Sequence, residues 1–82
     1  MKKVVGIGVT SKGTGYWIHT NEKLGEQQGV GERSASYYLN AESMNEALVQ
    51  AGLKNAGDLL GRHCGFDARD QFASAIFIMP SK

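Results

Sequence analysis

The chain has 82 residues, a formal net charge of +1 from nine basic and eight acidic side chains, and 11 glycines against one proline. This length fits a single domain over residues 1–82 with a small core. The near neutrality argues against a dedicated DNA-backbone binder, and the single cysteine excludes an internal disulfide. No apolar run approaches the roughly 18 residues of a membrane span, so we expect a cytoplasmic protein that does not enter a membrane.

Residues 3–10 alternate in a way that predicts a β-strand. One face carries Val5, Ile7 and Val9, whereas the other face is nearly bare because it contains Gly6 and Gly8. A bare face lets another element or a ligand approach the backbone closely. The turn-forming letters SKGTG follow, and the aromatic and β-branched residues 16–20 complete a predicted β-hairpin.

Residues 21–33 are polar and rich in glycine, and we expect a long loop there. A third strand is predicted over residues 34–39. A helix then follows, because apolar side chains recur at helical spacing at Met44, Ala47, Leu48 and Ala51.

Several residues mark the ends of this helical region. Ser43 and Glu46 form a capping-box pattern, and Asn40 is a rival cap that would start the helix about one turn earlier. Gly52 suits the left-handed residue that ends a helix. Asn55 or Asp58 is expected to cap a second, short helix.

The chain ends with a polar link at residues 61–70 and an apolar strand at residues 72–79. Apolar residues on both faces are typical of a central strand or of an oligomer interface, and we expect this strand to insert between earlier strands or beside the first one. The predicted fold is α+β: a small, mainly antiparallel sheet of four strands in the order β-β-β-α-β, with one helical segment packed on one face.

The sequence argues against several chemistries. Gly8 and Gly13 have the spacing of a phosphate-binding loop, but Thr14 replaces its lysine. Cys64 has too few potential co-ligands for a structural zinc site, and we expect a buried, inert thiol. The glycine of a helix-turn-helix motif is present at Gly52, but the segment after it makes a poor base-reading face. We therefore expect no catalytic residues, no metal and no cofactor.

Aromatic side chains gather on the second and third predicted strands. Trp17 and His19 share a face opposite Tyr16, and Tyr38 is expected near Trp17. Such rings either fill the core or anchor a partner, since Trp, Tyr and Arg dominate interface hot spots. The candidate partner-binding residues are Tyr16, Trp17, His19, Arg33, Tyr37 and Tyr38.

These patterns favour a non-enzymatic binding protein that covers the surface of a partner protein, as an adaptor or inhibitor does. Its size also fits an accessory protein carried by a phage or plasmid, and the apolar last strand is compatible with a homodimer. The alternative is a single-stranded nucleic-acid binder that combines the same rings with Lys2, Lys3, Lys12, Lys23 and Arg33. A third interpretation is a small-molecule-binding protein or small enzyme with a pocket under residues 21–33.

Overall fold

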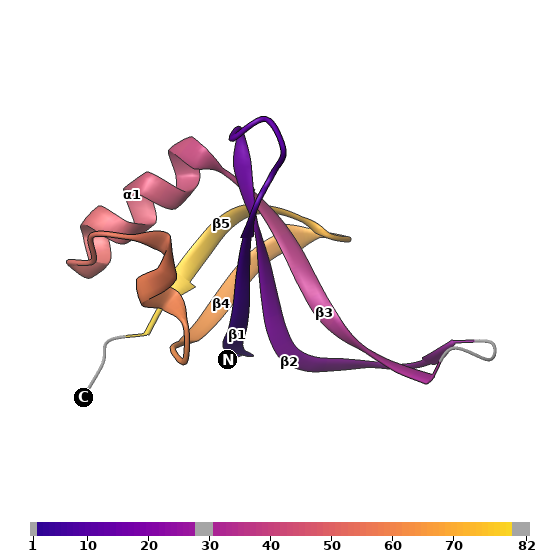
Figure 1. The fold of residues 1–82 in the computed structure, drawn as a ribbon. Helices are drawn as coiled ribbons and strands as arrows, with labels where there is room; N and C mark the ends of the chain where they lie inside the picture. The colour runs from indigo at the N-terminus through magenta and orange to yellow at the C-terminus, as the bar shows by residue number, and fades with distance from the viewer. Residues whose placement is uncertain (1, 28–30, 80–82) are drawn as a thin grey trace.

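Five β-strands and one α-helix make up the computed structural model within residues 2–27 and 31–79, the part of the chain that it describes (Figure 1). The strands are β1 (Lys2–Val9), β2 (Gly15–Gln27), β3 (Gly31–Asn40), β4 (His63–Arg69) and β5 (Phe72–Ile78). The helix α1 (Ala41–Ala51) lies between β3 and β4, and a short 3₁₀ helix, η1 (Ala56–Leu59), follows it.

The strands form a closed barrel in the order β1-β2-β3-β5-β4, because β4 also pairs with β1. All neighbours are antiparallel except β3 and β5, which run parallel and meet where Tyr38 lies opposite Phe72. The α+β class is thus confirmed. The predicted four-stranded, mainly antiparallel sheet is wrong in detail, since the sheet is mixed, has a fifth strand and closes on itself.

The additional strand is β4, which occupies much of the segment predicted to be a polar link. Its side chains alternate between inside and outside, with Cys64 buried and His63 exposed. Few residues of β4 point inward, so its sequence shows little of the apolar alternation that predicts a strand. β5 inserts between β3 and β4, as predicted, but it is covered on one face only, because Phe72 and Phe77 are exposed.

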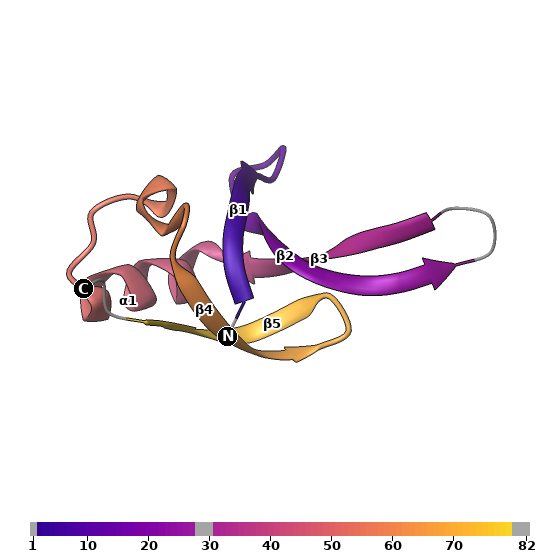
Figure 2. The ribbon, with the colours of Figure 1, turned by 90° about the horizontal axis from the view of Figure 1, so that it is seen from below.

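The predicted loop over residues 21–33 is also wrong. β2 and β3 continue past the barrel as a paired arm that projects from one side (Figures 1 and 2). Lys23 lies opposite Ser34, and Gln27 lies opposite Gly31. Residues 28–30 lie outside the described residues. The polar, glycine-rich sequence of this segment lacks the apolar alternation by which a strand is predicted, which explains why it resembled a loop.

The core lies inside the barrel and is closed by α1 at one end. Its buried members are Val4, Ile18, Leu39, Met44, Leu48, Leu59, Cys64 and Ile76. The face predicted from Val5, Ile7 and Val9 is wrong at Val5, because the register shifts between Val4 and Gly6 and turns Val4 inward.

The helix α1 is capped by Asn40, the rival of the predicted Ser43 cap. The Asn40 side-chain oxygen accepts a hydrogen bond from the Ser43 N–H at 2.8 Å, so α1 starts at Ala41 and the predicted Ser43 cap is wrong. Gly52 ends the helix in the left-handed region at φ 72°, as predicted. The second short helix is also confirmed: Asn55 occupies the cap position of η1, and its N–H donates to the Asp58 carboxylate at 3.0 Å.

Candidate functional site

The outer face of β2 and β3 carries the candidate site. Inward-pointing residues of these strands, such as Ile18 and Leu39, are fully buried. Side chains alternate along a strand, so Trp17 and His19 of β2 point outward, and Tyr38 of β3 lies directly opposite Trp17. This arrangement agrees with the predicted sharing of one face by Trp17 and His19.

Three aromatic rings form a row across three neighbouring strands. The ring centroids of Trp17 and Tyr38 are 5.6 Å apart at an interplanar angle of 64°. Those of Tyr38 and Phe72 are 6.2 Å apart at 67°. We call Trp17, Tyr38 and Phe72 the ring row. Phe72 is 64% exposed, and Trp17 and Tyr38 are partly exposed, so the row is open to a ligand.

Sequence reasoning missed Phe72 because its neighbour Tyr38 is far away in the chain. The only local signal was a phenylalanine placed directly after the polar turn at Asp70 and Gln71. In the fold, the Tyr38 N–H donates to the Gln71 carbonyl at 2.7 Å, and this bond holds the start of β5 against β3. The β4–β5 turn therefore positions the third ring.

Glycines beneath the rings let them approach the backbone. A Cβ atom added to Gly15 would lie 2.5 Å from the Tyr38 hydroxyl, so the tyrosine occupies the space that a side chain would need. At Gly6 the same atom would meet Cδ2 of His19 at 3.2 Å. The bare face predicted for β1 is thus covered in part by the imidazole of His19, which also lies 2.7 Å from the Ser36 hydroxyl through Nδ1.

Three basic side chains lie on the strands and the turn around the ring row. Arg69 of β4 lies opposite Phe72, and cross-strand partners project from the same face of a sheet, so its guanidinium belongs to the same surface. Lys23 lies opposite Ser34 and extends this surface toward the arm. Lys12 is exposed in the turn between β1 and β2. Asp70, with a positive φ of 54°, adds one acid at the β4–β5 turn.

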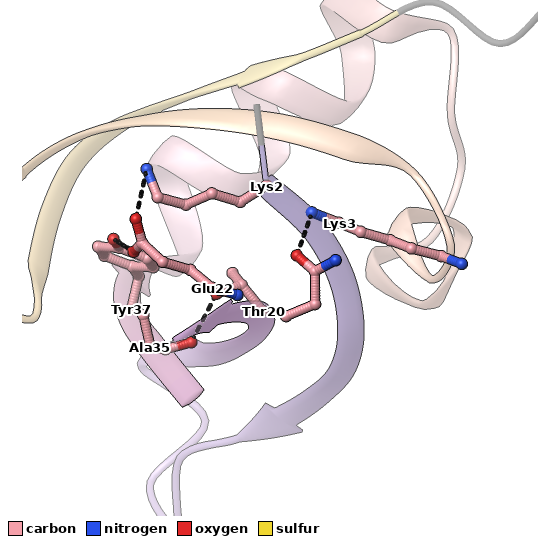
Figure 3. A network of polar contacts seen from close by, with 7 residues as sticks. Lys2, Lys3, Thr20, Glu22, Ala35 and Tyr37 are labelled. Atoms are coloured by element: carbon pink, nitrogen blue, oxygen red, sulfur yellow. Dashed lines mark hydrogen bonds and ion pairs between the residues drawn. The ribbon is translucent and has the colours of Figure 1, made fainter. Parts of the chain in front are cut away.

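Tyr16 and Tyr37 do not join this surface. Tyr16 packs against the core cluster. The rings of Tyr37 and Phe66 are stacked, with centroids 4.3 Å apart at an interplanar angle of 11°. The Tyr37 hydroxyl donates to Glu22 at 2.8 Å (Figure 3). Lys2 pairs with Glu22 at 3.6 Å, which completes a polar cluster at the barrel wall. Burial, together with Glu22, raises the pKa of Tyr37 to about 12.

The remaining predicted site residue is Arg33, whose backbone belongs to β3 and whose side chain lies outside the described part. The six predicted residues therefore divide into three groups. Trp17, His19 and Tyr38 lie together on the outer face, Tyr16 and Tyr37 lie on the inner side, and the side chain of Arg33 is not placed.

The thiol of Cys64 is buried, as predicted. Desolvation raises its pKa to about 11, against a smaller lowering by Arg62. A thiol in this state is a poor nucleophile because little thiolate forms near neutral pH. Within residues 2–27 and 31–79, no three His, Cys, Asp or Glu side chains come together in a group that could hold a metal ion.

Comparisons with known proteins identified no relative of this chain. No protein-family model, curated protein or solved structure gave a significant match to the chain. In the described part of the chain, no helix combines the length and the apolar content required to cross a membrane.

Proposed function

We propose that the protein binds single-stranded nucleic acid on the outer face of the barrel, with unpaired bases stacked on the ring row. The observation that carries this proposal is the row itself, with Trp17, Tyr38 and Phe72 on three neighbouring strands at centroid spacings of 5.6 and 6.2 Å. Every base has a π-face, so stacking on aromatic side chains holds a strand with little sequence preference. Duplex bases do not offer these faces.

The topology supports the same function by analogy at the level of the fold. The barrel here has five strands in the order β1-β2-β3-β5-β4, and in its strand number it resembles the five-stranded oligonucleotide/oligosaccharide-binding barrel. In that barrel the face of strands 2 and 3 and the loops between strands 1 and 2 and strands 4 and 5 bind the ligand. The ring row and Lys12 occupy the corresponding places here.

The charge distribution sets the expected strength of binding. Arg69 lies opposite Phe72, and Lys12 and Lys23 lie on the β1–β2 turn and on β2, although the whole chain carries a net charge of only +1. With about three phosphate contacts, the logarithm of the affinity is expected to fall with the logarithm of the salt concentration with a slope of about −2. Stacking therefore supplies a larger share of the binding free energy than it does in strongly basic proteins.

Trp17 provides a direct test because it is the only tryptophan in the chain. Adding oligothymidylate at low salt should quench its fluorescence. Phe72→Ala and Tyr38→Ala should each weaken the affinity by about tenfold, since one stacked base contributes about 1–3 kcal/mol. Arg69→Gln should reduce the salt slope by about one.

Phe77→Ala is the matched control, because Phe77 is also exposed on β5 but lies outside the ring row. This variant should bind as the wild type does. Absence of quenching at low salt would contradict the proposal. The sequence favoured a protein partner on the same surface, and this stays a prediction. Affinity capture from a nuclease-treated lysate tests it.

A further inference from the structure

A groove runs along the seam between α1 and β5, which lie side by side in both views of the fold (Figures 1 and 2). It consists of adjoining hollows of about 150, 250 and 440 Å³. Gln50 lines all three, which places it near the middle of the groove. None of the lining residues belongs to the ring row, so the groove is a separate surface.

On the β5 side of this groove, which polar side chains also line, two large apolar side chains are exposed to solvent. Phe77 is 58% exposed and Met79 is 46% exposed. Phe77 lies opposite Gly65 of β4, which has no side chain to cover the ring. On the helix side the groove is lined by Ala47 and Ala51, whose small side chains leave room for a large one. A partner that buries these residues would remove apolar surface from water.

The two ends of the groove carry opposite charges. Glu46 lines the hollow near the start of α1, together with Ser74 of β5. Arg62 lines the hollow at the other end, together with Gly52 and Met79. Neither Glu46 nor Arg62 forms an ion pair with another residue of the described ranges.

We propose that this groove binds the same groove of a second copy of the chain, in a two-fold symmetric dimer. A two-fold axis near Gln50 reverses the direction of the groove and brings Glu46 of each copy opposite the partner's Arg62. Such an interface is self-complementary, as a two-fold dimer requires, and its two ion pairs set the register. The net charge of +1 adds little repulsion between the copies.

The dimer explains an otherwise costly feature of β5. A strand that exposes large apolar side chains invites non-specific association, and burying them against a second copy removes this hazard. The ring row stays outside the interface, so each dimer presents two rows. The inference does not depend on the proposed function.

Sedimentation velocity over a range of protein concentrations tests the proposal. The wild type should sediment as a dimer at the highest protein concentrations. Phe77→Glu should shift the equilibrium to monomer, and Glu46→Arg and Arg62→Glu should each weaken association by about tenfold or more. The double variant Glu46→Arg/Arg62→Glu should restore the dimer, because it recreates both pairs with the signs exchanged.

Arg62 also donates from Nε to the Asp58 carbonyl at 3.1 Å, so circular dichroism must show that each variant is folded. A test that leaves both charges in place uses Gln50→Cys with a short bis-maleimide. This variant should cross-link to a dimer, whereas the control Lys12→Cys, in the exposed β1–β2 turn, should not. A monomeric wild type at every concentration, or failure of the double variant to recover association, would overturn the proposal. Oligonucleotide binding by Phe77→Glu is measured as well, because it tests the ring row separately from the dimer.

Discussion

At the scale of single residues, Gly15 is the position on which the ring row depends most directly. A Cβ atom there would lie 2.5–2.7 Å from the hydroxyl and ring atoms of Tyr38. Gly15→Ala should therefore push the Tyr38 ring away from the sheet and lower the free energy of unfolding by about 1–3 kcal/mol, the usual cost of overpacking. Urea denaturation gives the stability, and oligothymidylate titration gives the effect on the row.

The matched control for this prediction is Gly57→Ala, because an added methyl group at Gly57 meets nothing within 4 Å apart from its neighbours in the chain and the backbone of its own helix. This change should leave the stability unchanged or raise it slightly, since alanine has less backbone freedom than glycine in the unfolded chain. Equal effects at Gly15 and Gly57 would show that Tyr38 does not need the space above Gly15.

At the scale of secondary-structure elements, mutation can distinguish the two candidate caps at the start of α1. Asn40→Ala should destabilise the protein by about 1 kcal/mol, because the Asn40 side chain accepts the Ser43 N–H. Ser43→Ala, at the cap that the sequence also offered, should change the free energy of unfolding by a few tenths of a kcal/mol. Thermal unfolding of the two variants gives the comparison, and a larger loss for Ser43→Ala would assign the cap to Ser43.

The elements that sequence reasoning recovered are those governed by neighbours in the chain. The helix α1, the left-handed Gly52, η1 and the β1–β2 hairpin all depend on residues within a few positions of one another. Of the stripe predicted on α1, Met44 and Leu48 are buried, whereas Ala51 is exposed. β4 and the β2–β3 arm were missed for a common reason. Neither shows a continuous apolar pattern, because only part of β4 faces the core and the arm extends beyond it.

At the scale of the whole molecule, closure of the barrel was out of reach of the sequence. It depends on β1 pairing with β4 and on β3 meeting β5, and both contacts join segments far apart in the chain. The candidate site shares this dependence. Trp17 and Tyr38 were predicted as neighbours because they lie on consecutive strands, whereas Phe72 reaches them only through the parallel contact of β3 with β5.

Closure of the barrel also makes stability depend on alkaline pH. Cys64 lies opposite Lys2 of β1 and Ile78 of β5, and its thiol is fully buried in the core. Burial raises its pKa from 9.0 to about 11. The folded protein holds this proton more tightly than the unfolded chain, so the contribution is complete below pH 9 and is lost as the pH rises through about 11.

Cys64→Ala isolates this effect. The variant should be less stable than the wild type at pH 8, because a buried sulfur atom is removed from the core. The difference in free energy of unfolding between the two proteins should then shrink as the pH rises from about 9 to about 11, since only the wild type has a thiol to ionise. Tyr37, whose pKa is raised to about 12, contributes equally to both proteins and cancels in the comparison. Denaturant unfolding curves that keep a constant separation across this range would mean that the thiol ionises as readily in the folded barrel as in the open chain.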